Sequence, residues 1–204
     1  MMDKNLGLVE IQGFFMGCKF LFSNFSKEYT PYMQKQLLNT SIGGKMMISM
    51  AKLFNYHAWA TDKLLCYIET EVPDSFSAEI TSVFPSIKET FQHQYEVDCL
   101  WYGRMNKNYP IKGEPLSSPQ DYRKAFQELH QEIESFIADS SNLNRKVRYS
   151  TSIGEEFTND EEELLQHLVN HGTYHRGNIS AMLRQQGHPG CSTDYIYYLR
   201  EMEG

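Results

Sequence analysis

The stretch TNDEEELLQHLVNHGTYHRGNISAMLRQQG, residues 158–187, predicts one long helix and with it a helical fold. Its apolar residues recur at the three- and four-residue spacing of a helical face. Thr158 with Glu161 three residues later has the pattern of a capping box, and the acidic run complements the positive end of the helix dipole. Gly187 is the expected stop. We therefore expect this helix to run from Thr158 to about Gln186.

Two histidines of this helix fall in the middle of its apolar face. An advance of about 100° per residue places His171 and His175 on either side of the line that joins Leu164 and Met182. Each buried imidazole needs polar partners, because an unpaired buried polar group costs roughly 1–3 kcal/mol. A divalent metal ion would meet that need, and so would a hydrogen-bonded pair held by carboxylates or water. For the pair alone, both interpretations stay open.

A third metal ligand has to come from another helix. In KETFQHQYEVDCLWYGR, residues 88–104, His93 shares one helical stripe with Thr90, Val97 and Leu100, so it can face inward. A single inward histidine is more often a core residue than a ligand. Its value lies in joining the pair, which makes His93, His171 and His175 the candidate ligands of one site.

The other histidines are weaker candidates. We expect His57, beside a tryptophan in NYHAWATDKLL, to lie at the surface, and His130 to flank the apolar stripe of its helix. His188 lies in a Gly-Pro loop, where we expect it to be solvated. His167, at the edge of the apolar face, is a possible donor behind a ligand or a substitute ligand.

Other polar residues near the predicted ligands could orient them or move protons. They are Asp98, Glu96 and Tyr95 on the helix of His93. Arg176 follows a ligand but points away from the apolar face, so we expect it to pair with an acid at a helix or subunit contact.

Three further helices and one hairpin complete the predicted fold. The helices run roughly over 47–71, over 85–107, and from a cap at Ser118 with Pro119 in the first turn. The segment KVRYSTSIGEEFT, residues 146–158, predicts a small hairpin that turns near Gly154. The tail STDYIYYLREMEG should pack its tyrosines on the body. Long helices with modest connections predict an all-α protein, an antiparallel four-helix bundle with a small hairpin between helices 3 and 4.

Composition and charge limit the function. The chain has 204 residues, of which 41% are hydrophobic, so one globular domain is expected. A net charge of −7 without a dense basic cluster argues against nucleic acid as a partner. The four cysteines are scattered and form no CxxC pair, which favours free thiols in a reducing, cytoplasmic compartment. A Ser-His-Asp pattern, a phosphate-binding loop and an HExxH motif are all missing from the sequence.

Residues 1–45 differ from the rest. IQGFFMGCKFLFSNF, residues 11–25, is apolar but too short to span a bilayer and is interrupted by Lys19, so we expect no membrane partner. It also lacks the pattern of a secretory signal. The segment is either a docking arm or a stretch that precedes the natural start of the domain, and we favour the second interpretation. We therefore expect an N-terminal extension over 1–45 and the core domain over 46–204.

The chain combines NHGTYHRGNISAMLRQQG (170–187) with FQHQYEVDCLW upstream and STDYIYYLRE in the tail. This combination, which covers roughly residues 47–201, resembles the DinB-like (DinB/YfiT-type, damage-inducible) family. LFNYHAWATDKLL, with Trp59, is similar to the family's first helix, and Asp98 and Trp101 match its second. The segment 170–187 is the most specific of these. The extension over 1–45 departs from the family pattern, which does not include it.

The resemblance implies a four-helix bundle with a three-histidine metal site, carried over by position to His93, His171 and His175. It also implies zinc or nickel as the metal and a homodimer as the assembly. Relatives of the family include low-molecular-weight-thiol transferases, a thiol-dependent isomerase and metal-dependent hydrolases. Two classes of function stay open. The first is a metal-dependent transferase or hydrolase acting on a small molecule such as a low-molecular-weight thiol. The second is a non-catalytic metal- or ligand-binding stress-response protein.

Overall fold

The computed structural model describes residues 49–107, 116–139, 143–151 and 153–203, so the prediction for 1–45 lies outside these ranges. Within them the chain is mostly helical, as predicted, with one small sheet. The elements in order are α2 (Met50–Glu71), the 3-10 turn η4 (Pro73–Ser75), α3 (Ile87–Met105), α4 (Pro119–Asp139), β1 (Lys146–Ser150), β2 (Glu156–Asp160), α5 (Glu161–Gln185) and α6 (Tyr195–Glu203). None of the described helices is both long and apolar enough to cross a lipid bilayer.

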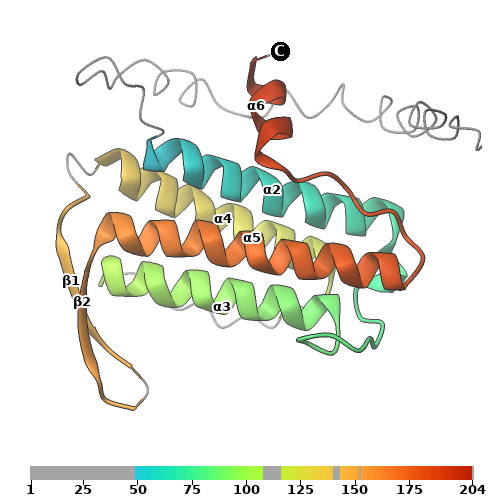
Figure 1. Ribbon diagram of the computed structural model, residues 1–204, viewed down its shortest axis with the longest axis horizontal. Helices are drawn as coiled ribbons and strands as arrows, with labels where there is room; N and C mark the ends of the chain where they lie inside the picture. The colour runs from blue at the N-terminus through green and yellow to red at the C-terminus, as the bar shows by residue number, and fades with distance from the viewer. Residues whose placement is uncertain (1–48, 108–115, 140–142, 152, 204) are drawn as a thin grey trace, which may run out of the picture. The chain divides into compact units, whose positions relative to one another are not determined.

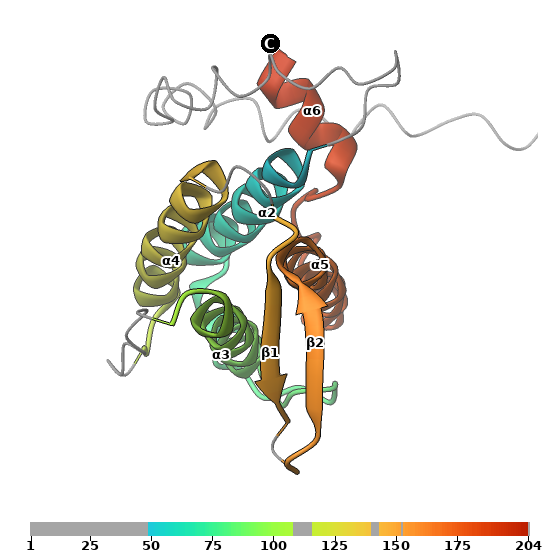
Figure 2. The ribbon, with the colours of Figure 1, turned by 90° about the vertical axis from the view of Figure 1, so that its left-hand side faces the viewer.

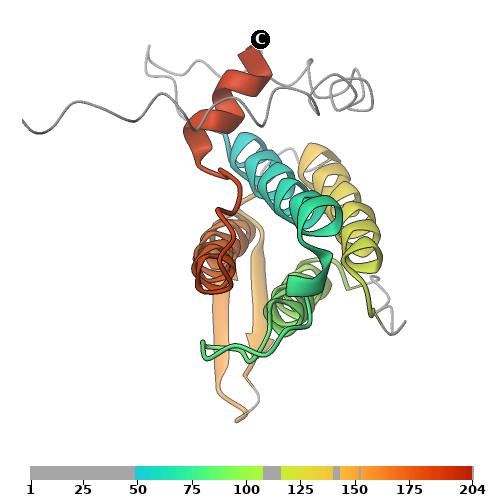
Figure 3. The same cartoon turned by 90° about the vertical axis from the view of Figure 1, so that its right-hand side faces the viewer.

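The four long helices share one apolar core. Helix α2 packs on α4 and α5, and α3 packs on the same two helices (Figure 1). The end views show the four helices around a common centre (Figures 2 and 3). Each helix contributes fully buried side chains to this centre, among them Phe54, Phe91, Phe126 and Leu165. The polar groups described below lie within this frame.

The start of α5 differs from the prediction. Thr158 is not the cap, because it pairs with Arg148 in a two-stranded ladder that continues to the pair Lys146 and Asp160. The helix begins only where the ladder ends, and Asp160 is its N-cap. The Asp160 N–H donates to the Glu163 carboxylate over 2.9 Å, so a capping box exists two residues later than expected.

The other predicted boundaries hold closely. Helix α4 starts with Pro119, and Ser118 accepts a hydrogen bond from the Asp121 N–H as a cap should. Gly187, with φ of 86°, follows α5 in the left-handed conformation that ends helices. The hairpin forms over the expected residues and turns at Gly154, which also has φ of 86°.

The C-terminal helix α6 packs back on the body, as predicted. Tyr198 is buried against the rings of Tyr56 and Trp59 on α2. The Trp59 indole N–H donates to the Glu201 carboxylate over 2.9 Å. The tail therefore covers the outer face of α2, the helix whose inner face meets α4 and α5 (Figure 3).

Candidate metal centre

The structure brings the three predicted ligands together. Helix α5 presents His171 and His175 one turn apart, and α3 presents His93 from the neighbouring position. The Nε2 atom of His171 lies 3.2 Å from Nε2 of His93 and 3.0 Å from Nε2 of His175. One potential ligand atom from each residue lies within 4.8 Å of the other two. Two helices thus direct three imidazole nitrogens at one point.

The environment of His171 and His175 favours their neutral form. His175 is buried, whereas His93 and His171 are half-buried. Burial, followed by the nearby His175 ring, lowers the pKa of His171 to about 4. Burial, followed by the nearby His93 ring, lowers the pKa of His175 to about 4. Both rings therefore keep a lone pair at neutral pH, and a metal ion binds only the neutral form.

The pattern of hydrogen bonds fits a metal ion better than it fits the histidines alone. A neutral imidazole has one N–H and one lone pair. The Nδ1 atoms of His171 and His175 are buried with no hydrogen-bond partner among the described residues. Neither Nδ1 atom therefore forms a hydrogen bond, whether or not it carries the proton of its ring. The Nε2 of His171 faces two other Nε2 atoms and can donate to only one of them. If the Nε2 atoms all keep their lone pairs, one cation can accept all three.

Aromatic rings border the three histidines. Phe84 lies 4.9 Å from the ring of His93 and 5.8 Å from that of His175, and Tyr174 lies 5.0 Å from His175. His167 lies 5.6 Å from the ring of His171, and burial lowers its pKa. His167 is therefore a neighbour of a predicted ligand, but Nδ1 of His171 accepts no hydrogen bond from it.

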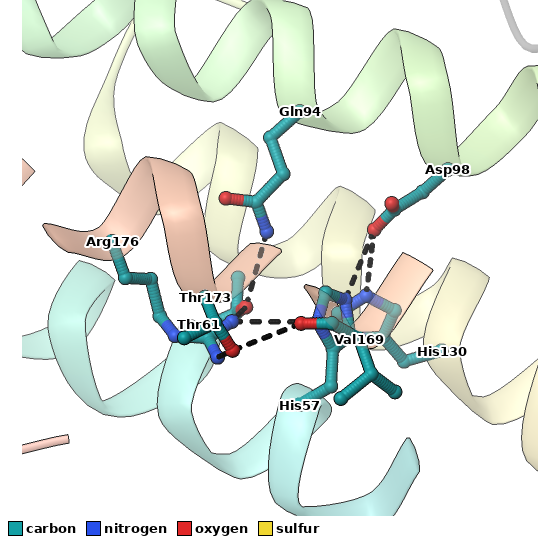
Figure 4. Close-up of polar contacts among 8 residues, drawn as sticks. All are labelled: His57, Thr61, Gln94, Asp98, His130, Val169, Thr173 and Arg176. Carbon is teal, nitrogen blue, oxygen red and sulfur yellow. Dashed lines mark hydrogen bonds and ion pairs between the residues drawn. The ribbon is translucent and has the colours of Figure 1, made fainter. Parts of the chain in front are cut away.

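A second buried polar group lies deeper in the molecule, and the sequence analysis missed it. His57 and His130 both face Asp98, with Nε2 atoms 3.2 and 3.3 Å from the same carboxylate oxygen, Oδ2 (Figure 4). All three residues are buried, and their donor atoms are spaced so that the group could hold a metal ion. The prediction of His57 as a surface residue is wrong, because its exposed fraction is 0%.

A signal for this burial does exist in the sequence. His57 falls in the alternating three- and four-residue series of Phe54, Thr61 and Leu64, all of which are fully buried on α2. His130 likewise follows Phe126 by one turn, and it is buried rather than at the edge of its stripe. His57 was expected at the surface because it lies beside Trp59 in the sequence. Trp59 faces the C-terminal helix, whereas His57 points inward.

Arg176 also differs from the prediction. Its exposed fraction is 2%, and among the described residues it hydrogen-bonds with hydroxyl groups and an imidazole instead of an acid. The guanidinium donates to Thr61 over 3.3 Å and to Thr173 over 3.0 Å, and it lies 3.3 Å from Nδ1 of His57. The expected acid partner is replaced by hydroxyl groups and an imidazole at the contact of α5 with α2.

The remaining candidates lie elsewhere. Tyr95 is buried and packs its ring edge-on against Phe126. Glu96 is exposed and accepts a hydrogen bond from Gln92 over 2.6 Å. His188 is half-buried in the loop after α5, where its backbone N–H donates to the carbonyl of Leu183. None of these contacts joins the three-histidine group.

Two comparisons with known proteins identify the family of the chain. The model of the DinB family matches residues 35–203, a range that begins ahead of the expected boundary at 46. Protein DinB of Bacillus subtilis (strain 168) is 32% identical over an alignment of 158 residues, and the match covers 72% of this chain and 92% of that relative. A match of this extent, over all the described helices, shows common descent: the chain belongs to the DinB family.

Proposed function

We propose that this chain holds one divalent metal ion, zinc or nickel, through the Nε2 atoms of His93, His171 and His175. The convergence of these three atoms, 3.0 and 3.2 Å apart, carries the proposal. The edges of a tetrahedral site with metal–nitrogen distances of about 2.0–2.1 Å have a similar length. The low pKa of His171 and His175 adds support, because rings that stay neutral need no deprotonation before they bind a cation.

We further propose that the site is catalytic and acts on a small molecule, as a thiol transferase or a hydrolase. Within the described part of the chain, the group contains three histidines and no fourth ligand. Catalytic zinc sites keep a position open in this way, whereas structural sites use four protein ligands. When bound, a divalent ion would lower the pKa of a coordinated water or thiol and so supply hydroxide or thiolate near neutral pH.

The chain's own side chains would shape the access to that position. His93 and His171 are half-buried, so the converging nitrogens lie near the protein surface and not at its centre. Phe84 and Tyr174 border His93 and His175 with aromatic surface and would exclude water from that side. A substrate with a small apolar part next to its thiol or carbonyl group fits such surroundings best.

The finer description of the fold and assembly belongs to the same proposal. The contacts of α2 and α3 with both α4 and α5 support an antiparallel four-helix bundle. We propose residues 46–204 as its domain and a homodimer as its assembly. We propose no nucleic-acid partner, because a net charge of −7 repels a phosphate backbone.

The test combines metal content with activity. Elemental analysis of the purified protein should find one zinc or nickel ion per chain, and His93→Ala, His171→Ala and His175→Ala should each lose most of it. His188→Ala, in the loop beyond α5, is the matched control and should keep full occupancy. Turnover of small thiols with electrophiles, or of ester and amide substrates, should appear only in the metal-loaded protein. Full occupancy in the ligand variants would refute the site, and inactivity of the loaded protein on both panels would favour the non-catalytic alternative.

A further inference from the structure

We propose that His57, Thr61, Asp98 and Arg176 form a metal-free hydrogen-bonded network that positions the two helices carrying the metal ligands. The inference rests on the proposed metal site at His93, His171 and His175, and it assigns positioning residues to that site. It also decides between two interpretations of the buried group of His57, Asp98 and His130, which has the donor atoms of a second metal site.

Arg176 determines which nitrogen of His57 carries the proton. A guanidinium N–H can only donate, so Nδ1 of His57, 3.3 Å from Nη1 of Arg176, must be the acceptor. The single proton of the neutral ring is then on Nε2, where it donates to Oδ2 of Asp98 over 3.2 Å. With both nitrogens engaged in this way, His57 has no lone pair left for a metal ion.

The formal charges lead to the same conclusion. Arg176, His57 and Asp98 lie in a row and are each almost fully buried, with one positive charge at one end and one negative charge at the other. This row is neutral as a whole. A divalent ion would leave two uncompensated positive charges in the interior, which is strongly unfavourable. His130 adds a second N–H toward Asp98, at 3.3 Å.

The pKa values are consistent with this assignment. Burial by itself would raise the pKa of Asp98, but the two histidines outweigh it and hold the pKa at about 2. Burial lowers the pKa of His57 to about 4 against the attraction of Asp98. An ionised carboxylate and a neutral imidazole are the two forms that the hydrogen bonds require.

The network touches the residue that follows each proposed ligand. Gln94 follows His93, Gly172 follows His171, and Arg176 follows His175. The amide of Gln94 and the guanidinium of Arg176 both donate to the hydroxyl of Thr61, over 3.2 and 3.3 Å (Figure 4). A single side chain of α2 thus holds one residue of α3 and one of α5.

Gly172 supplies the closest contact. A Cβ atom at this position would lie 2.3 Å from Cε1 of His57 and 2.8 Å from Nη1 of Arg176. The backbone of α5 therefore lies directly against the His57 ring, next to a proposed ligand. Helix α2 supplies no proposed ligand of its own, yet through His57 and Thr61 it sets the separation of the two helices that do. The distances between a metal ion and its ligands must be correct to about 0.2 Å, so a small change in the separation of α3 and α5 would weaken metal binding.

The test measures zinc affinity and folding separately in the full chain. Thr61→Val keeps the shape of the side chain but removes the shared acceptor, and Thr61→Ser restores the hydroxyl. We expect zinc affinity, measured by competition with a chromogenic chelator, to fall about 10- to 100-fold in Thr61→Val and Asp98→Asn and to recover in Thr61→Ser. Leu64→Ala, one turn along the same helix, is the control: it should lower the unfolding midpoint and leave zinc affinity within about threefold.

Each outcome can be distinguished. A wild-type protein that binds two zinc ions, one of which is lost in His57→Gln, would overturn the metal-free assignment. Unchanged affinity in a folded Thr61→Val protein, or an equal loss in Leu64→Ala, would overturn the positioning role. Failure of the proposed function looks different, because zinc would then not bind the wild type or would bind His171→Ala equally well.

Discussion

His57 and His171 are both histidines with lowered pKa values, but their nitrogens have different neighbours. His171 has an Nε2 that faces two other imidazoles and an Nδ1 that no described residue hydrogen-bonds, so a cation would improve its surroundings. His57 has an arginine on one nitrogen and a carboxylate on the other, so its hydrogen bonds are already complete. At the residue scale, the partners of each ring decide its role, and residue type alone does not.

The residue scale also predicts the pH dependence of stability. Burial lowers the pKa of His57 from 6.5 to about 4, so between these values the unfolded chain binds more protons than the folded one. The free energy of unfolding must then rise with pH across this window, and the stabilisation is lost as pH falls from about 6.5 to 4. His171 and His175 act in the same direction.

Urea unfolding in the presence of a chelator, at pH 7.5 and pH 5, checks this expectation. The wild type should be clearly less stable at pH 5, and His57→Gln should remove up to roughly 2 kcal/mol of that difference, since one pKa unit corresponds to 1.36 kcal/mol. His188→Gln should retain the difference. A wild type that is as stable at pH 5 as at pH 7.5 would show that these rings are not buried as described.

At the scale of elements, two faces of α5 contact different helices. One face carries His171 and His175 toward α3, and the other lays Gly172 and Arg176 against α2. Sequence periodicity was enough to find the first face, because both histidines fall among the apolar residues of one helix. It was not enough for the second, because His57 and Thr61, two partners of Arg176, lie on a helix more than 100 residues away in sequence.

Two glycines of α5 give a matched test of this arrangement. In the described part of the chain nothing lies within 4 Å of a Cβ at Gly177, so Gly177→Ala should stabilise the helix by about 0.5–1 kcal/mol. Gly172→Ala would place a methyl group against His57 and should destabilise the protein by about 1–3 kcal/mol through overpacking. Urea midpoints of both variants measure the difference, and shifts of the same sign would contradict the close approach of α5 to His57.

At the scale of the whole molecule, the sequence predicts local structure better than it predicts contacts between residues that are distant along the chain. The long helices, the hairpin turn at Gly154 and the packing of the tail follow from spacing, caps and turn residues, and they are confirmed. The group of His57, Asp98 and His130 joins three helices, and no local pattern states which helices are neighbours. The misplaced cap at Thr158 has a similar cause, because the end of a ladder depends on its partner strand.

Metal removal should affect the whole fold. The proposed ligands come from α3 and α5, so an ion bound between them stabilises only the folded state. At a free ion concentration 100-fold above the dissociation constant, this amounts to about 2.7 kcal/mol. Thermal unfolding should therefore occur at a lower temperature in chelator. His171→Ala should melt at the same temperature with and without chelator. A wild type whose melting temperature is also unaffected by chelator would count against a site between the two helices.

The most direct test of the account is anomalous diffraction from crystals of the metal-loaded protein, collected at the absorption edge of the bound ion. The account predicts one peak per chain, about 2.0–2.1 Å from Nε2 of His93, His171 and His175. It predicts no peak beside Asp98, where the Nε2–H group of His57 donates a hydrogen bond to the carboxylate. A peak between His57, Asp98 and His130, or the absence of any peak at the three histidines, would contradict it.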